Sequence, residues 1–279
     1  AGWLTYLGLY ALQHRGEESA GIVVRDGNKI NVHKGMGLVC EVFSESSIKE
    51  LKGDTAVGHV RYSTTGSSCV ENIQPFCAYH KKTHISVAHN GNLTNIAALR
   101  QLMEDKGSIF QTSMDSEIIA HLIAAGCRRN IEENIIAAMK SIEGAYSLVL
   151  MIDDMLVGAR DPYGFRPLCL GKFEGAYVLA SETSALDLVR AEYVRDIEPG
   201  EIVFIRKDKI DSVKPFCENR KAHCIFEYIY FSRPDSNIFG NNVYLCRKRL
   251  GENLALECKL DCDIVTPVPD SGCYAAIGF

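Results

Sequence analysis

The stretch VAHNGNLTN, residues 87–95, is where the fold of the chain can first be read. Its opening residues have the apolar character of a strand, and the Asn90–Gly91 pair that follows is typical of a tight β-hairpin. A hairpin would continue as a second strand. Instead, apolar residues recur with helical spacing at Leu93, Ile96, Leu99, Leu102 and Met103. Asn92 or Thr94 can cap the start of such a helix, so we expect the Asn-Gly turn to join a strand to a helix.

The rest of the chain continues this succession of strands and helices. Helices are predicted at residues 4–9, 93–105, 115–125 and 131–142. Strands are predicted at residues 21–24, 30–33, 55–64, 84–90, 145–152, 155–160, 176–181 and 201–210. Strands, then helices, then strands again favour a layered arrangement in which sheets pack on one another and helices cover them.

A polar, charged segment at residues 207–223 interrupts the pattern and is the best candidate for a linker. Beyond it we predict a helix around residues 243–257 and a strand at residues 263–271, which leads into a Gly-containing turn. The carboxyl end of a strand is where open α/β sheets place their ligands. We therefore predict one domain at residues 1–220 and the beginning of a second at residues 221–279.

Composition argues against several classes of protein. The chain has 279 residues, of which 47% are hydrophobic and 23% charged, as in ordinary soluble globular proteins. No apolar run of membrane-spanning length and no charged-then-apolar leader is present, so neither secretion nor a membrane partner is expected. A net charge of −5 argues against a nucleic-acid partner. Eleven cysteines without a pairwise framework favour reduced thiols in the cytoplasm.

Polar residues at a few positions of the first domain are of the types that chemistry requires. Arg61 lies in an otherwise apolar strand, Asp115 begins a predicted helix, and Arg15 follows an apolar helix. The Asn90–Gly91 pair is a further such position. Structural alternatives exist: Arg61 can pair with a surface carboxylate, Asp115 can act only as an N-cap, and Arg15 can mark only the end of a helix.

Together these residues suit a binding site for a free amino acid. An arginine such as Arg61 binds an α-carboxylate in bidentate fashion, and a carboxylate such as Asp115 binds the ammonium group. The side-chain amide of Asn90 and the backbone N–H of Gly91 supply two donors, as an oxyanion hole for acyl transfer requires. Such a site suits hydrolysis of a side-chain amide, although a nucleophile is missing from the set.

Longer motifs make the chain resemble the class II, N-terminal-nucleophile glutamine amidotransferases. They are LGLYALQHRGEESAGI (7–22), GHVRYSTTG (58–66), NIQPF (72–76), VAHNGNLTN (87–95), DSE (115–117), EGAYSLV (143–149), ARDPYGFRPL (159–168) and ASETSALD (180–187). CIFEYIYFSRPDS (224–236) and TPVPDSG (266–272) narrow the resemblance to the amidophosphoribosyltransferase family. Amidotransferases that make glucosamine 6-phosphate or asparagine share the first half but carry different second domains.

The resemblance implies an α+β fold: a four-layer αββα sandwich of the N-terminal-nucleophile hydrolase type, followed by the start of an α/β type I phosphoribosyltransferase domain. Arg61 matches the residue that holds the α-carboxylate of glutamine, and Asp115 matches the residue that holds its ammonium group. Asn90 and Gly91 match the oxyanion-hole pair. The resemblance therefore implies that the Asn-Gly turn is catalytic.

The family's nucleophile is an N-terminal cysteine whose own α-amine acts as the base. No cysteine precedes Ala1, so we expect this residue to lie upstream in a longer protein. The diphosphate-binding signature of the family is expected after residue 279. We accordingly expect the 279-residue chain alone to release no ammonia from glutamine.

Two further residues match metal positions of the family. Cys224 matches a ligand of a [4Fe–4S] cluster, which needs three other thiolates, and a plain buried thiol is its alternative. Ser271 matches a position of the Mg²⁺-phosphoribosyl pyrophosphate site, where a hydroxyl oxygen suits this hard cation, and a simple turn serine is its alternative.

The implied function is the first committed step of de novo purine biosynthesis. Ammonia from glutamine is transferred to phosphoribosyl pyrophosphate, giving 5-phosphoribosylamine, glutamate and diphosphate. The expected partners are these two substrates and further copies of the chain in a homo-oligomer. The alternative is a catalytically dead module that binds glutamine or serves in assembly.

Overall fold

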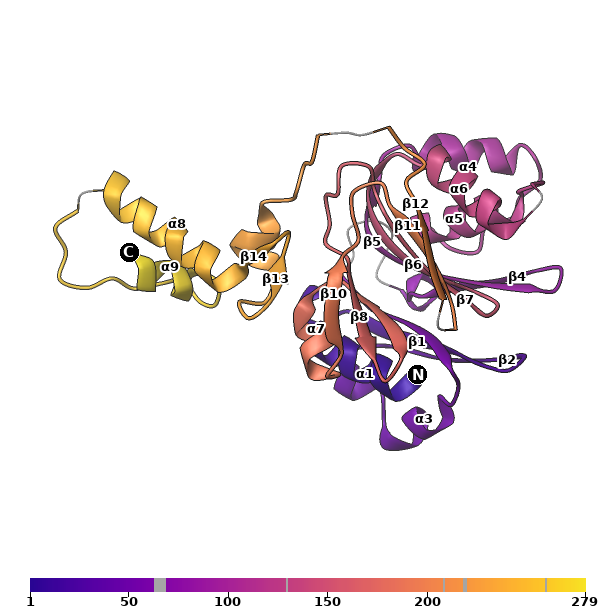
Figure 1. Cartoon of the computed structure of the whole chain (residues 1–279), viewed down its shortest axis with the longest axis horizontal. Coiled ribbons are helices and arrows are strands. Elements are labelled where there is room, and N and C mark those ends of the chain that lie inside the picture. Colours follow the sequence, from indigo (N-terminus) through magenta and orange to yellow (C-terminus); the bar gives the residue numbers. More distant parts are fainter. Residues whose placement is uncertain (63–68, 129, 208, 218–219, 259) are drawn as a thin grey trace.

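Two layers of antiparallel β-sheet pack face to face, and helices cover their outer faces (Figure 1). The computed structural model describes residues 1–62, 69–128, 130–207, 209–217, 220–258 and 260–279. The first layer is a six-stranded sheet with the order β12 (Lys209–Val213), β11 (Ile202–Arg206), β7 (Met155–Arg160), β6 (Gly144–Ile152), β5 (Thr83–Leu93) and β4 (Phe76–His80). The second layer holds two three-stranded sheets. Their orders are β2 (Lys29–Met36), β1 (Ser19–Asp26) and β3 (Thr55–Arg61), and β10 (Glu192–Asp196), β8 (Cys169–Phe173) and β9 (Ala176–Ala180).

Strand β6 shows how alternating side chains create the layers. Tyr146, Leu148 and Leu150 face outward and belong to the buried cluster beneath one group of helices. Met151 faces inward and packs against Val23 of the opposite layer. The covering helices are α4 (Ile96–Glu104), α5 (Asp115–Ala124) and α6 (Ile131–Ser141). Both faces of the strand are therefore buried, which is why nearly all its residues are apolar.

The second group of helices covers the outer face of the second layer. It consists of α1 (Gly2–Ala11), α2 (Val39–Val42), α3 (Glu45–Glu50) and α7 (Thr183–Leu188). Leu9 of α1, Ile22 of β1 and Leu186 of α7 belong to one buried cluster, which joins both three-stranded sheets to these helices. The order helices, sheet, sheet, helices confirms the predicted αββα sandwich.

The expected turn at Asn90–Gly91 is wrong. Both residues lie inside β5, where Asn90 is opposite Ser147 and Gly91 is opposite Tyr146 of β6. The strand ends only at Leu93, and α4 starts at Ile96. Strand β6 pairs with β5 from Ile85 to Leu93, and pairing with such a distant partner overrides the local turn signal.

The single strand expected at residues 201–210 is also wrong. Two strands occupy this region, and Arg206 of β11 lies opposite Lys209 of β12. Lys207 has a φ of +52°, which permits the tight turn between them. Because β12 belongs to the six-stranded sheet, a linker can begin only after Val213, later than the expected start at residue 207.

The strand expected at residues 263–271 does not form. No described strand lies beside this segment, and Ile264 and Val268 are 80% and 84% exposed. A strand needs backbone partners, which the described residues do not supply here. Apolar residues in this segment are therefore not sufficient to predict a strand.

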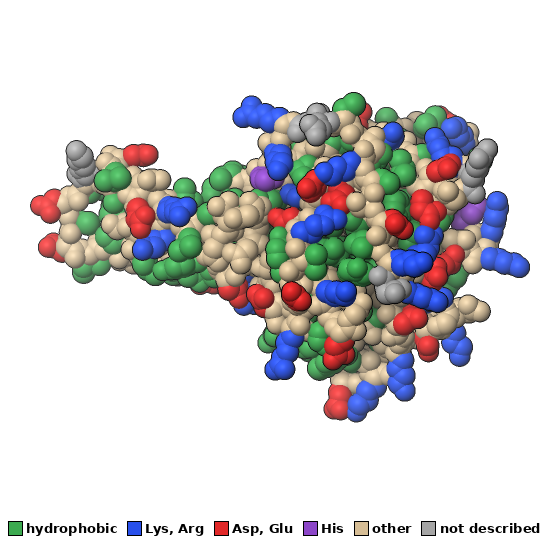
Figure 2. Space-filling view, viewed as in Figure 1, with side chains coloured by type: hydrophobic (Ala, Val, Ile, Leu, Met, Phe, Trp, Pro, Cys, Tyr) green, Lys and Arg blue, Asp and Glu red, His purple; other side chains and the backbone are tan. Residues whose placement is uncertain are grey.

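Residues after 224 first pack against the sandwich, as in the contact of Glu227 with Arg15, and extend away from it from residue 243 onward (Figure 1). They contain a π-helical turn at Glu227–Phe231, β13 (Asn237–Ile238), β14 (Asn241–Asn242), α8 (Val243–Glu257) and α9 (Gly272–Gly278). Figure 2 shows hydrophobic side chains on the surface of this extension, where Leu250, Leu254 and Leu256 are exposed. The domain boundary near residue 220 stays a prediction. No helix in the described part of the chain is long and apolar enough to cross a membrane.

Candidate functional site

A cavity of about 120 Å³ lies where the ends of β3 and β5 meet the first turn of α5. Its wall includes Arg61, Asn90, Gly91 and Asp115, so the structure brings together the residues predicted for a glutamine site. The other lining residues are Leu9, Leu12, Arg15, Gly58, His59, Val60, Tyr62, Gln74, His89, Met114, Arg166, Ser181 and Phe231. The cavity thus combines apolar walls with a few polar groups, as small-molecule sites do.

Arg61 is the last residue of β3, and its side chain is only 4% exposed. Its Nη1 lies 3.8 Å from Oε2 of Glu18, close to the outer limit of an ion pair. Gly16 packs against its backbone, and a Cβ on Gly16 would lie 2.5 Å from the Arg61 carbonyl carbon. Only glycine fits there. Arg61 is therefore held in the cavity wall. The alternative that it is a surface arginine paired with a surface carboxylate does not fit its burial.

Asn90 and Gly91 bring two possible hydrogen-bond donors to the cavity. The side-chain Nδ2 of Asn90 is buried and has no hydrogen-bond partner in the described part of the chain. Such an atom is costly unless a ligand or water supplies an acceptor. Gly91 has a φ of +152°, and a Cβ would lie 2.0 Å from the carbonyl oxygen of Ala145. This backbone conformation and close approach require glycine at position 91.

Asp115 provides a buried negative charge at the start of α5. Met114 occupies the N-cap position, so capping does not explain Asp115. Its Oδ2 lies 2.9 Å from Nδ1 of His89. Burial alone would raise the pKa of Asp115, but His89 and the backbone N–H groups of the first helical turn outweigh burial and lower this pKa. The carboxylate stays charged and can bind a cation.

His59 supports the same corner of the cavity in its neutral form. Its Nε2 donates a hydrogen bond to the carbonyl oxygen of His89 at 3.0 Å. Burial, aided by the positive charge of Arg61, lowers the pKa of His59 to about 4. Its Nδ1 is buried without a partner among the described residues, so a second proton would have no acceptor there.

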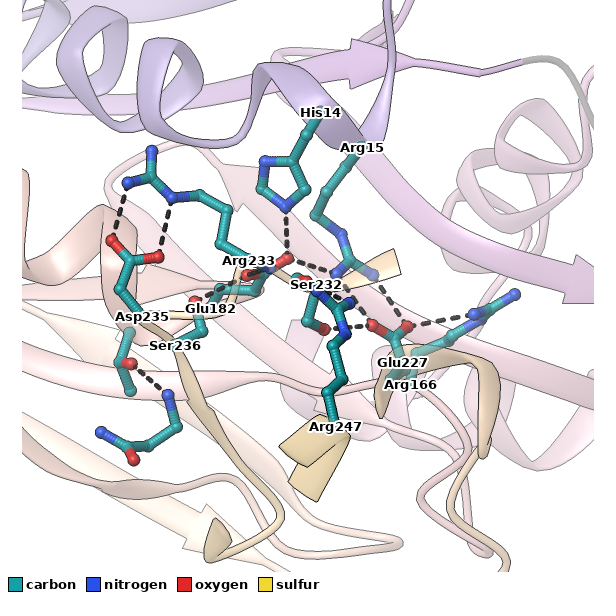
Figure 3. Close-up of polar contacts among 12 residues, drawn as sticks. His14, Arg15, Arg166, Glu182, Glu227, Ser232, Arg233, Asp235, Ser236 and Arg247 are labelled. Carbon is teal, nitrogen blue, oxygen red and sulfur yellow. Dashed lines mark hydrogen bonds and ion pairs between the residues drawn. The ribbon is translucent and has the colours of Figure 1, made fainter. Parts of the chain in front are cut away.

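A network of buried charges forms another part of the cavity wall (Figure 3). The Arg15 guanidinium donates to both carboxylate oxygens of Glu227 at 2.9 Å and to Oε1 of Glu182 at 2.6 Å. Arg166 donates to Glu227 at 3.0 Å, and the ring of Phe231 lies beneath both guanidinium groups. Arg15, Arg166 and Phe231 all line the cavity. The segment after residue 224 therefore contributes to this site.

The acidic members of the network are completely buried but remain charged. Burial would raise the pKa of both glutamates, but hydrogen bonds and positive charges outweigh it. The pKa of Glu182 falls to about 2, mainly through His14 and Arg15. The pKa of Glu227 is lowered chiefly by Arg15. Ser236 Oγ and the backbone N–H of Arg233 donate further hydrogen bonds to Glu182.

The two predicted metal positions lie outside the cavity lining. Cys224 is partly buried, and its Sγ accepts a hydrogen bond from Arg166 at 3.7 Å. Ser271 precedes α9 and makes no side-chain cap. The described residues contain no group of three or more His, Cys, Asp or Glu side chains placed to hold a metal ion. They do not by themselves fit a cluster that needs four thiolates.

Sequence reasoning missed several residues of the site. His59 and His89 lie in the motifs that carry Arg61 and Asn90, where a polar residue in an apolar strand is the available signal, and Gln74 lies in the motif NIQPF just before β4. Glu182 and Glu227 also lie in named motifs. Their pairing with Arg15 spans 167 and 212 residues, a separation that no local pattern reveals.

Comparisons with known proteins add an independent line of evidence. A family model described as a glutamine amidotransferase domain matches residues 59–188. Amidophosphoribosyltransferase 1, chloroplastic, of Arabidopsis thaliana is 50% identical over 281 residues, covering 100% of the chain and 50% of the relative. The amidophosphoribosyltransferase of Bacillus subtilis is 46% identical over 277 residues, covering 99% of the chain and 58% of the relative. The chain thus spans between half and three fifths of these relatives.

Solved structures agree with this result. One described as the allosteric regulatory enzyme of purine biosynthesis matches with a TM-score of 0.96 and 46% identity, over 100% of the chain and 60% of that structure. Another, the glutamine phosphoribosylpyrophosphate amidotransferase of B. subtilis complexed with ADP and GMP, matches with a TM-score of 0.95, 46% identity and the same coverage.

The lowered pKa of His59 predicts an acid-dependent loss of stability. The unfolded histidine titrates near 6.5 and the folded one near 4, so the unfolded state binds more protons between these values. The free energy of unfolding should fall as pH drops through this window, by about 1.4 kcal/mol per pKa unit. His59→Gln retains a donor for the His89 carbonyl without titrating. Urea unfolding at pH 7 and pH 4.5 should show a smaller loss for this variant, and equal losses would contradict the assignment.

The buried charge network predicts a large effect of losing Glu227. Glu227→Ala leaves the buried Arg15 without its bidentate partner, and breaking such pairs costs about 3–5 kcal/mol. Asp235→Ala is the matched control, because the Arg233–Asp235 pair is about half exposed, and exposed pairs contribute about 0–1 kcal/mol. Chemical denaturation should separate the two variants. Similar small losses for both would show that the network does not hold the fold together.

Proposed function

The chain belongs to the amidophosphoribosyltransferase family of glutamine amidotransferases, and on this premise we propose that its cavity binds L-glutamine and supports release of ammonia from the side-chain amide. The whole protein then transfers this ammonia to phosphoribosyl pyrophosphate, giving 5-phosphoribosylamine, glutamate and diphosphate. This is the first committed step of de novo purine biosynthesis. The observation that carries the proposal is the presence of Arg61, Asp115, Asn90 and Gly91 in one cavity wall.

Opposite charges in the cavity match the two charged groups of an amino acid. Arg61 presents a planar guanidinium that fits the α-carboxylate, and Asp115 presents a carboxylate that stays ionised and fits the ammonium group. Both are buried, so little water screens their attraction for the ligand. Binding both groups fixes the direction in which the side chain of glutamine extends.

The side-chain amide of glutamine then meets Asn90 and Gly91. Attack on its carbonyl carbon places negative charge on the carbonyl oxygen. The unpartnered Nδ2 of Asn90 and the backbone N–H of Gly91 donate to this oxygen and stabilise the charge. Both donors are held in place before the reaction begins. They therefore stabilise the charge without having to move during the reaction. The attacking group in this proposal is the N-terminal cysteine thiol that the family resemblance implies.

The proposal also includes the expected cofactors, the oligomeric state and the cellular location of the protein. Cys224 would provide one thiolate to a [4Fe–4S] cluster, and Ser271 would provide a hydroxyl oxygen near Mg²⁺ in the phosphoribosyl pyrophosphate site. The ammonia-releasing step described above involves neither residue. A homo-oligomer in the cytoplasm, with glutamine and phosphoribosyl pyrophosphate as substrates, completes the proposal.

Arg61→Ala in the full-length protein tests the binding of the α-carboxylate. The KM for glutamine should rise strongly, because a buried charge-assisted contact is lost, whereas the reaction with free ammonia should change far less. Steady-state assays with each nitrogen donor measure both effects. Equal losses with glutamine and ammonia would remove Arg61 from the glutamine site.

Asn90→Ala tests the oxyanion hole. Removing one such donor lowers kcat by roughly two to three orders of magnitude, while the KM for glutamine should change little. An alanine scan position outside the cavity, Asn31→Ala, provides a control with an exposed amide. An unchanged kcat for Asn90→Ala would show that this residue has only a structural role, and a catalytically dead module would lack glutaminase activity altogether.

A further inference from the structure

We propose that His89 is a positioning residue, whose ring holds the Asp115 carboxylate in the orientation that receives the α-ammonium group of the ligand. The inference rests on the proposed function and adds to it. The predicted glutamine contacts include Asp115 but say nothing about what orients this carboxylate.

The backbone of His89 is fixed on both sides. Its N–H donates to Oε1 of Gln74 at 2.8 Å, and its carbonyl oxygen accepts from Nε2 of His59 at 3.0 Å. Both partners also line the cavity. His89 itself lies in β5, and its side chain is only 1% exposed. The ring therefore has a fixed base and little room to change its rotamer.

The ring of His89 contacts Asp115 through a defined edge. Nδ1 lies 2.9 Å from Oδ2 of Asp115. A charged carboxylate can only accept a hydrogen bond, so Nδ1 carries a proton and donates it. Among the described residues His89 is the only side chain that pairs with Asp115. Without His89, the first turn of α5 would be the one element of the described residues that orients the carboxylate oxygens.

The opposite edge of the ring argues against a role in packing alone. Nε2 of His89 is buried and has no hydrogen-bond partner in the described ranges. Such a buried nitrogen is costly unless a ligand or water supplies a partner. Nε2 lies beside Gly91, because a Cβ on Gly91 would be 2.9 Å from it. His89 is thus held by Asp115 on one edge and adjoins the expected oxyanion site on the other.

This arrangement predicts that loss of His89 affects ligands according to whether they carry an α-ammonium group. A disoriented Asp115 weakens binding of glutamine, which has this group. It does not weaken binding of glutaramate, the same molecule without the amino group. A charge-assisted contact of this kind corresponds to a change of about 10- to 100-fold in affinity. The glutaramate affinity should change by less than about 3-fold, within the ordinary scatter of such contacts.

Three substitutions distinguish the edges of the ring. The amide nitrogen of Asn can reach the position of Nδ1, so His89→Asn should retain much of the preference for glutamine over glutaramate. His89→Gln reaches the position of Nε2 instead, and His89→Leu has no donor, so both should lose the preference. His84→Asn is the matched control, since His84 is buried in the same strand and lies outside the cavity lining.

The test uses the full-length protein, with the KM for glutamine and the inhibition constant for glutaramate measured for each variant. A selective loss for glutamine in His89→Leu, with recovery in His89→Asn, supports the proposal. Equal weakening of both ligands, or a loss in His89→Asn as large as in His89→Leu, overturns it. If His89→Leu does not fold, the comparison of Asn with Gln decides alone. If the unmodified protein itself fails to prefer glutamine, the proposed function fails instead.

Discussion

The buried charge of Arg15 is the constraint on which the arrangement of the site depends. Its side chain is 7% exposed, so the guanidinium needs partners from the protein. Burial alone would lower the pKa of Arg15, but Glu227 and Glu182 outweigh it and raise this pKa. Those partners come from the start of α7 and from the segment after residue 224. Satisfying one charge therefore brings three distant segments together and closes one wall of the cavity (Figure 3).

The β-sandwich forms the other wall of the cavity, and regular secondary structure holds the side chains of this wall in place. Two charged side chains buried at the edge of its apolar layers, Arg61 and Asp115, have charged partners, whereas Nδ2 of Asn90 has no partner among the described residues. Arg61 and Asp115 lie at the ends of regular elements, where a rigid backbone holds each side chain in place. Asn90 and Gly91 lie inside a strand that is paired on β6. Strands and the first turn of a helix hold side chains more precisely than a free turn does. Such precision suits groups that must be in place before charge develops.

The fold and the main site residues were readable from the sequence to different degrees. Long periodic segments such as residues 115–125 and 131–142 gave correct helices, because an amphipathic pattern is a local property. The Asn-Gly pair by itself predicts a turn, because the strand that pairs with it, β6, lies more than fifty residues away in sequence. Arg61, Asn90, Gly91 and Asp115 were identified by residue type and family motif, and the structure places them together. His89, Glu182 and Glu227 escaped notice because their importance lies in contacts between distant segments.

The central claim is that this cavity holds glutamine with its charged ends on Arg61 and Asp115. A crystal structure of the full-length protein with bound glutamine, or with a reactive glutamine analogue, tests it most directly. The account predicts that the α-carboxylate contacts the Arg61 guanidinium and that the α-ammonium contacts Asp115. In a tetrahedral adduct formed with such an analogue, the oxyanion should lie about 2.7–3.1 Å from the Asn90 and Gly91 donors. Glutamine bound at another site, or bound here with its two ends exchanged, would contradict the account.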